Sequence, residues 1–541
     1  MEHTLIIKYK NTNLDIYIKN EKIDYNINED IALDLLRDNF NESIANLSIK
    51  HNSLEYWLMR LSERNTLIHS LFLDICKVKL LESFNKSNLT IFTNNLSIYL
   101  YFKHIADISF SDMLLFKSKI FSSNFKPYLH VIRFLLKKIL FQVKYADISY
   151  KKNLNTFTII QTWVSDNNFK INDFKDSYYG NLAQYLKENG KKVITWPIFY
   201  NLKDEKRAIA YLRKNQNNFL VIEDYLKFAD YIEAVKHFFV KRFLKLGNIR
   251  IDNSDFTSVF KYYQKKETIE MVSLFYSFTR RLKENNNENI TFIHQHENMI
   301  PEKALILGVK RYLPNSKVIG YFHTTKPKNI LCLDYANNKE YKVAPKPDAI
   351  IFNCNKYKKY YQEKYSHLPM HNGIAFKQKY LKDNNQTLNE SSRLILVLFS
   401  GRNGEIELMF SLLNKISTDY KFLFRMHPMN QFNVKKYYTK DNYIIVNNES
   451  LDESLSKVNK VISTYSAVAL ESALKGFIIG LVYNKEDLLL NPFDFTNIDN
   501  YSLISNFSEL NKFLKEEFTI YNVEQIFNID EEFYKIFLEV T

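Results

Sequence analysis

The sequence has few cysteines, few glycines and no long apolar run. Its three cysteines, Cys76, Cys332 and Cys354, stand singly among 541 residues and form no C-x-x-C pair. Three thiols cannot supply a disulfide framework, and the paired cysteines of common zinc motifs are absent, so we expect a reducing compartment. No apolar stretch of about 18 or more residues predicts a membrane span, and the first residues lack the pattern of a signal peptide. We therefore expect a cytoplasmic protein.

The net charge is +14, but the composition offers an explanation unrelated to binding. Glycine and proline number 10 each, and glycine falls well below its usual share of about 7%. Lys, Asn, Ile, Tyr and Phe are abundant, as is typical of an AT-rich coding sequence, and this raises the lysine content by itself. No block of Lys and Arg, RNP pattern or Cys/His finger occurs, so we expect no nucleic-acid partner.

The length predicts two or more domains, and the order of segments indicates three parts. Residues 1–150 are expected to form a mainly helical N-terminal region, with apolar residues at intervals of three to four. In residues 151–380 short β-rich runs alternate with helical stretches, as in a parallel α/β sheet. A polar stretch at 375–392 indicates a linker, and the alternation restarts in residues 390–541. The expected fold is α/β, with two Rossmann-like domains and a cleft between them.

Individual strands and helices can be placed within this plan. The expected strands lie at 156–162, 192–195, 290–294, 317–321 and 348–352 in the first α/β domain and at 393–399, 422–425, 443–446, 461–463 and 477–481 in the second. The expected helices cover 181–188, 301–311, 405–416 and 468–475. Ligands of such sheets bind beyond the carboxyl ends of the strands, so the loops that follow strands hold the candidate site residues.

In the second domain a hydroxyl-rich loop joins a strand to a helix. Ser463, Thr464 and Ser466 precede the helix expected at 468–475, whose free N–H groups and dipole favour an anion. The hydroxyls can donate hydrogen bonds to phosphate oxygens, and Glu471 on the helix lies within reach of a ribose hydroxyl. The competing interpretation of the serines is plain helix capping.

Two further loops of this domain carry cations. One strand ends in R-M-H-P, which contains Arg425, His427 and Pro428. A cation at this strand end could meet the same phosphate, so Arg425 and His427 are candidates for binding it, with a turn histidine as the alternative for His427. The G-R-N-G loop after the first strand lets the backbone approach a ligand. Its Arg402 is either a partner for an acidic sugar or a surface arginine, and the loop lacks the spacing of a dinucleotide fingerprint or P-loop.

The R-x-H-P loop followed by S-S/T-x-S-A-x-x-x-E-x-x-x-x-G resembles the second domain of GT-B glycosyltransferases that use cytidine-nucleotide donors, such as bacterial sialyltransferases and Kdo transferases. The resemblance implies that the donor is bound by His427, Pro428, Ser463, Thr464, Ser466 and Glu471. It implies that His427 and the hydroxyl loop contact the CMP phosphate, the Pro428 backbone the cytosine and Glu471 the ribose. Thr464 stands where serine is usual and keeps the hydroxyl.

Segments of the first domain at 158–180, 292–323, 347–354 and 372–376 resemble bacterial surface-carbohydrate biosynthesis proteins. Both resemblances together cover roughly residues 155–490. They imply a glycosyltransferase that moves an acidic sugar (sialic-, pseudaminic-, legionaminic- or Kdo-like) from a CMP donor onto a bacterial surface glycan, with a glycan or lipid-linked glycan as acceptor. CMP is a fair leaving group and no D-x-D motif stands at a strand end, so we expect neither a metal nor a cofactor.

The acceptor hydroxyl needs a base on the first domain. Glu297, Asp166 and His323 each follow a strand, and Glu297 ranks first and Asp166 second as the catalytic carboxylate. His427 completes the catalytic set from the donor side. Asp176 and His323 are expected on the acceptor side, although loop support or helix capping is the alternative for Asp176. The alternative for Glu297 is that it simply begins, with Asn298, the helix at Pro301. The pattern leaves open whether the carboxylate is a base that inverts the anomeric centre or a nucleophile that retains it.

The reaction class has two alternatives. A CDP-polyol phosphotransferase of the teichoic-acid type would share the two-domain plan and the hydroxyl-rich loop. A catalytically inactive glycan-binding scaffold would keep the fold and tolerate loss of both His427 and Glu297.

Residues 129–146 form a basic amphipathic segment. Such a helix can lie on an anionic surface, which would place the protein at the inner face of the cytoplasmic membrane. Packing of the helix on its own domain is the interpretation that we prefer.

Overall fold

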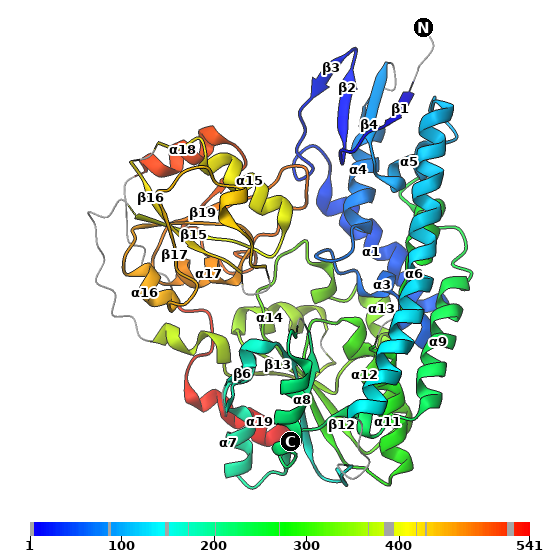
Figure 1. The fold of residues 1–541 in the computed structure, drawn as a ribbon, viewed down its shortest axis with the longest axis vertical. Coiled ribbons are helices and arrows are strands. Elements are labelled where there is room, and N and C mark those ends of the chain that lie inside the picture. Colours follow the sequence, from blue (N-terminus) through cyan, green and yellow to red (C-terminus); the bar gives the residue numbers. More distant parts are fainter. Residues whose placement is uncertain are drawn as a thin grey trace.

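The computed structural model describes residues 5–84, 88–145, 151–170, 173–200, 202–269, 271–365, 367–382, 394–417, 419–427, 430–516 and 524–541. Figure 1 shows three parts: an N-terminal region with a small sheet and a long helix, and two α/β domains beside one another. Within these ranges no helix is long and apolar enough to cross a membrane.

The N-terminal region combines a four-stranded sheet with helices. The sheet has the order β1-β4-β2-β3, with β1 (Leu5–Tyr9), β2 (Asp15–Ile18), β3 (Glu21–Ile23) and β4 (Leu89–Thr93). The helices are α1 (Leu33–Lys50), α2 (Leu54–Trp57), α3 (Arg60–Glu63), α4 (Leu71–Ser83), α5 (Leu96–Phe102) and α6 (Phe110–Tyr145). In α1, Leu36, Phe40 and Ile44 recur at helical spacing and are buried, so this face packs on the core. The expected helices are present, and the region also contains the small four-stranded sheet, which was not predicted.

The first α/β domain contains a six-stranded sheet in the order β14-β13-β12-β11-β5-β8, with every pairing parallel. Its strands are β5 (Thr158–Val164), β8 (Val193–Phe199), β11 (Thr291–Gln295), β12 (Lys317–Phe322), β13 (Ala349–Phe352) and β14 (Met370–Asn372). Its main helices are α7 (Leu182–Glu188), α8 (Glu205–Lys214), α9 (Phe228–Phe243), α10 (Thr257–Lys265), α11 (Ser273–Glu284), α12 (Ile300–Tyr312), α13 (Asn338–Val343) and α14 (Asn355–Lys364). Strands β11 and β13 are buried along their whole length, as is usual in parallel sheets covered on both faces. The strand order reverses between β5 and β11, which is where such sheets bind ligands.

The second α/β domain contains a six-stranded parallel sheet in the order β17-β16-β15-β18-β19-β20. Its strands are β15 (Leu394–Leu398), β16 (Lys421–Arg425), β17 (Tyr443–Ile445), β18 (Lys460–Ser463), β19 (Ile479–Val482) and β20 (Tyr501–Ile504). Its helices include α15 (Asn403–Leu413), α16 (Leu451–Leu455), α17 (Ala467–Leu474) and α18 (Phe507–Lys515). In chain order this is the Rossmann arrangement 3-2-1-4-5-6, whose binding crevice lies between the first and fourth strands, here β15 and β18. The predicted fold, two Rossmann-like α/β domains preceded by a mainly helical N-terminal region, is confirmed.

Three connections hold the parts together. The 3₁₀ segment η5 (Phe376–Lys382) follows β14 and leads towards the second domain. The chain end returns to the first domain. The Ala375 amide donates to the Asn528 carbonyl, the Asn528 amide donates to the Asn353 carbonyl, and Phe537 of α19 (Lys535–Val540) is buried there. Segment 524–541, expected with the second domain, therefore lies on the first. The N-terminal region reaches the second domain, where the Ile27 amide donates to the Lys485 carbonyl at 2.9 Å.

Candidate active site

A cavity of about 430 Å³ lies at the carboxyl ends of β5, β11 and β12. The lining residues are Ile68, Gln161, Trp163, Tyr178, Tyr200, Gln295, Glu297, Met299, Pro301, Glu302 and His323. Most of the wall is apolar or aromatic, and the ionisable groups Glu297, Glu302 and His323 lie beyond β11 and β12. A concave site of this kind, at the point where the strand order reverses, is the expected place for a substrate.

Glu297 and His323 form the polar end of this cavity. Nε2 of His323 lies 3.5 Å from Oε1 of Glu297. Burial, and then the negative charge of Glu302, raise the pKa of Glu297 to about 7. Burial and the charge of Lys377 hold the pKa of His323 well below its usual range. At neutral pH the neutral imidazole of His323 therefore lies beside the carboxyl group of Glu297, which is close to half ionised. The Glu297 side chain is 27% exposed and remains accessible.

Glu302, at the start of α12, holds the loop that carries Glu297. Oε1 of Glu302 accepts hydrogen bonds from the backbone amides of Glu297 (2.8 Å) and Met299 (3.2 Å), and Oε2 accepts one from the amide of Asn298 (2.9 Å). Asn298 has a φ of 55°, a left-handed conformation that asparagine tolerates well. These bonds bring the three amides onto one carboxylate and turn the chain so that Glu297 enters the cavity.

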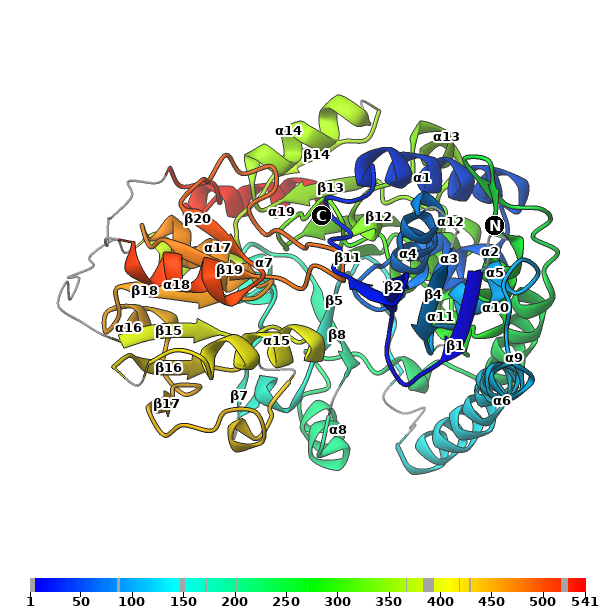
Figure 2. The same ribbon diagram turned by 90° about the horizontal axis from the view of Figure 1, so that it is seen from above.

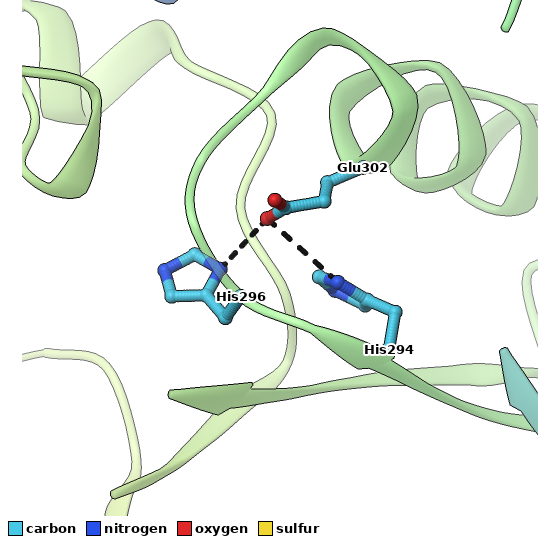
Figure 3. A group of neighbouring side chains, drawn as sticks. All are labelled: His294, His296 and Glu302. Carbon is cyan, nitrogen blue, oxygen red and sulfur yellow. Dashed lines mark hydrogen bonds and ion pairs between the residues drawn. The ribbon is translucent and has the colours of Figure 1, made fainter. Parts of the chain in front are cut away.

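His294, His296 and Glu302 form a buried group whose possible ligand atoms lie within 4.8 Å of one another (Figure 3). His296 Nδ1 lies 3.1 Å from Oε2 of Glu302. His294 Nδ1 lies 2.8 Å from the carbonyl oxygen of Gln295, which can only accept a hydrogen bond, and 3.7 Å from Oε2 of Glu302. Glu302 already accepts three amide bonds and one imidazole bond, close to the capacity of a carboxylate. The group therefore fits a hydrogen-bonded support for the cavity wall.

Lys377, on η5, stands among the charged groups of both domains. Its Nζ atom lies 3.9 Å from the centre of the Tyr178 ring, and the residue is exposed. Desolvation by the surrounding protein lowers the pKa of Lys377 to about 8, and the negative charges of Glu297, Glu471 and Asp176 oppose this shift. Sequence reasoning missed this lysine. The sequence feature that could have indicated Lys377 is its position after β14, directly following the N-G-I-A-F segment at 372–376.

The hydroxyl-rich loop after β18 is tied into the second domain. The Ser463 hydroxyl donates to the Thr464 carbonyl at 2.7 Å, and Thr464 Oγ1 accepts from the Ser400 amide at 2.8 Å. Both side chains are buried. Ser466 caps α17, because its Oγ accepts from the Val468 amide at 3.2 Å, and it is only half-buried. The capping interpretation holds for Ser466, and the binding of donor by these hydroxyls stays a prediction.

Glu471 on α17 faces the linker segment η5. Its carboxylate accepts hydrogen bonds from Nε2 of Gln378 (2.8 Å) and the hydroxyl of Tyr380 (2.5 Å). Burial raises the pKa of Glu471. The bonds join α17 to the segment that carries Lys377, so one carboxylate couples the donor-side helix to the domain boundary.

Arg425 and His427 lie at the end of β16. The Arg425 guanidinium donates to the Glu449 carbonyl at 2.7 Å, which holds the following loop. His427 is half-buried, and burial together with the charge of Lys377 lowers its pKa. Pro428 lies outside the described residues. The charge of Lys377, on the segment between the domains, therefore acts on His427, and the binding of a donor phosphate by His427 stays a prediction.

Asp166 and Asp176 accept hydrogen bonds from backbone amides of nearby loops. Asp166 accepts from the amides of Lys203 (2.8 Å) and Asp204 (3.3 Å), and it does not line the cavity. The structure thus supports a loop-holding role for it, because its acceptor sites face those amides. Asp176 accepts from the amide of Tyr178 at 2.7 Å and from Thr162 at 3.1 Å. This geometry matches the alternative interpretation of Asp176, which is loop support. The supported loop carries Tyr178, which lines the cavity.

Arg402 forms ion pairs with two carboxylates of the second domain. One guanidinium nitrogen lies 2.8 Å from Oε1 of Glu405, and the other contacts Asp487. With two carboxylates as partners, the side chain would have to exchange one of them to bind an acidic sugar, and that role stays a prediction.

Comparisons with known proteins give likenesses of fold only. No protein-family profile matches the sequence, and no curated protein matches it. A glycosyltransferase of kitacinnamycin is 8% identical over 71% of this chain and 94% of its own, with a TM-score of 0.36. MurG of Acinetobacter baumannii is 10% identical over 66% of this chain and 89% of its own (TM-score 0.35). The wall teichoic acid polymerase TagF is 12% identical over 73% of this chain and 88% of its own (TM-score 0.30).

Proposed function

We propose that this chain is a glycosyltransferase. In this proposal, the second domain binds a nucleotide-activated sugar, the cavity of the first domain seats the acceptor, and Glu297 removes the proton of the acceptor hydroxyl. The observation that carries it is the position of Glu297. Its carboxyl group stands in a mostly apolar cavity at a strand end, beside the neutral His323, with a pKa raised to about 7. A base with a pKa near the working pH is the most effective one.

The proposed reaction is a direct displacement. The acceptor oxygen attacks the anomeric carbon while its proton passes to Glu297. The bond between that carbon and the donor phosphate breaks, and the nucleotide leaves with the electron pair. Glu302, the other carboxylate of the cavity, is occupied by amide hydrogen bonds, so a single free carboxylate lines the described cavity. A single direct displacement of this kind inverts the anomeric centre.

The leaving phosphate needs positive charge as its own negative charge develops. Lys377 supports this role because its charge is coupled to Glu297 and Asp176 of the first domain and to Glu471 of the second. His427 adds a second nitrogen near Lys377. The start of α17, capped by Ser466, offers free N–H groups to an anion.

We further propose a CMP-activated acidic sugar as the donor and a bacterial surface glycan, free or lipid-linked, as the acceptor. Support comes from the R-x-H-P and hydroxyl-loop sequences and from the cation at the domain boundary, which suits a sugar carboxylate as well as a phosphate. Transfer of a polyol phosphate from a CDP donor is the second candidate. It would use the same base, but its product would be a phosphodiester.

The first test is a thermal-shift panel of the purified protein with CMP, CDP, UDP, GDP and ADP. A nucleotide at 100 times its dissociation constant adds about 2.7 kcal/mol of stability, visible as a shift of roughly 2–4 °C. Selective stabilisation by CMP supports the donor proposal. Stabilisation by UDP or GDP would keep the reaction class and discard the acidic sugar.

A second test identifies the product. The protein is incubated with CMP-sugars and with CDP-glycerol, and the new bond is assigned by mass spectrometry and phosphorus NMR. A glycosidic bond supports the main proposal, and a phosphodiester supports the polyol alternative. A scaffold would form neither product, and its binding of glycans would tolerate Glu297→Gln and His427→Ala alike.

A further inference from the structure

Helix α6 exposes large apolar side chains along most of its length. The row includes Phe121, Phe125, Ile132, Leu136, Leu140 and Val143. Steps of three, four or seven residues separate them, so they lie on one face of the helix. The opposite face is buried through Phe116, Val131 and Phe141. The helix therefore packs on its own protein, as the sequence favoured, and still leaves a full apolar face uncovered.

Helix α9 extends this face. It runs beside α6 in both views (Figures 1 and 2), and the rings of Tyr128 on α6 and Phe239 on α9 lie 6.2 Å apart. Phe228, Ile232 and Phe243 of α9 are exposed by 60%, 50% and 69%. We name the exposed apolar surface of these two helices the α6–α9 face. Contiguous apolar surface of this kind marks an interaction site.

A basic row borders the apolar one on α6. Its members are Lys119, Lys126, Arg133, Lys137 and Lys144, all exposed. Their seven- and four-residue steps place them on one side of the helix, next to the apolar row. Asp112 is the single acidic residue of α6, and it accepts a hydrogen bond from the Tyr9 amide.

We propose that the α6–α9 face docks on the surface of an anionic lipid bilayer. An apolar face with a lysine-rich border is the pattern of helices that lie in the interface plane, with apolar side chains among the acyl chains and cations at the head groups. A second copy of this chain is the other candidate occupant. It would bring two basic rows together without acidic partners on α6, so charge complementarity favours the lipid.

Vesicle flotation tests the proposal with the full chain. We expect the protein to float with vesicles of equal parts phosphatidylglycerol and phosphatidylcholine, and to bind pure phosphatidylcholine at least about tenfold more weakly. The triple variant Ile132→Gln, Leu136→Gln, Leu140→Gln should lose about tenfold or more of its binding to the mixed vesicles. Its unfolding temperature should not fall, because the three side chains are exposed. Ile444→Gln, a 59% exposed residue on β17, is the matched control and should bind as the wild type does.

Charge and self-association complete the test. Lys126→Gln, Arg133→Gln, Lys137→Gln should weaken binding to the mixed vesicles and reduce its dependence on salt. Absence of wild-type binding to the mixed vesicles overturns the proposal. So does a wild-type dimer in analytical ultracentrifugation that the apolar variant converts to monomer without any change in vesicle binding. Each readout is independent of transfer activity, so failure here would leave the proposed function standing.

Discussion

Nε2 of His323 lies 3.5 Å from Oε1 of Glu297, although 25 residues of chain and the helix α12 separate the two. The contact joins the ends of two adjacent parallel strands, β11 and β12. The imidazole has its pKa far below the usual range and the carboxyl group has its pKa raised to about 7, both chiefly through burial. Neither partner of this pair is fully charged at neutral pH, and perturbed groups of this kind cluster at functional sites.

Glu297→Gln should lower transfer by roughly 10²–10⁴-fold, because glutamine cannot accept the proton. The same variant should be more stable than the wild type at pH 8 by about 1–3 kcal/mol. The folded-state pKa of about 7 exceeds the ordinary 4.5, so stability falls as pH rises through this interval, and glutamine avoids the loss. Chemical denaturation at pH 4 and pH 8 measures the difference. A purely structural Glu297 would show the reverse, with a variant less stable at pH 8.

The proposed chemistry predicts a narrow bell-shaped pH dependence of kcat/KM. Activity should rise through about pH 7 as Glu297 loses its proton and fall above about pH 8 as Lys377 loses its own. Glu297→Gln should remove the acidic limb from the residual rate. A rate that is flat between pH 6 and 9 would contradict both assignments.

Lys377→Met should reduce transfer by about a hundredfold or more through loss of charge at the leaving phosphate. It should also move the acidic limb of the pH profile to higher pH, because the lysine charge favours the ionised form of Glu297. Lys379→Met, on the same segment and paired with Glu531 at 3.5 Å, is the matched control. If both variants lost the same amount of transfer activity, the cause would be a disturbance of segment η5 and not the missing charge at the phosphate.

His427→Ala should abolish most transfer while the fold changes little. The loss should appear in nucleotide binding by calorimetry, because the proposed partner of His427 is the donor phosphate. His371→Ala, at a half-buried histidine on β14, provides a control in the other domain. Turnover near the wild-type rate would remove His427 from the donor site.

Glu302→Gln should destabilise the protein by about 2–4 kcal/mol, because an amide cannot satisfy three backbone N–H groups and an imidazole. It should also shift the acidic limb to lower pH, since the Glu302 charge raises the pKa of Glu297. Denaturant unfolding and the pH profile measure the two effects. Glu509→Gln, an exposed cap of α18 that accepts from the Ser505 amide, should change stability far less.

Much of the fold could be predicted because its signals are local. The strands expected at 317–321 and 422–425 correspond to β12 and β16, since buried parallel strands are short apolar runs bounded by polar loops. The helix expected at 301–311 matches α12, where Pro301 marks the first turn. The four-stranded N-terminal sheet was harder to predict, because β4 pairs with β1 and β2, whose partner residues lie 71 to 84 positions earlier in the chain, and such pairing leaves little trace in sequence.

The candidate site followed from the sequence only in part. Glu297 and Asp166 both follow strands, and the sequence could not tell which carboxylate is free. Three-dimensional packing brings the amides of Lys203 and Asp204 to Asp166 and leaves Glu297 in the cavity. Burial and neighbouring charge, which depend on the whole fold, then set the pKa of Glu297.

The sequence alone determined the two α/β domains, the loops that follow their strands and the basic amphipathic character of α6, because apolar periodicity and turn residues are short-range properties. The tertiary structure decided the rest. It brought Lys377 from a connecting segment to the charges of both domains, assigned Glu302 to support and Glu297 to the cavity, and left one face of α6 uncovered. These outcomes depend on contacts between residues far apart in the chain, which no local pattern encodes.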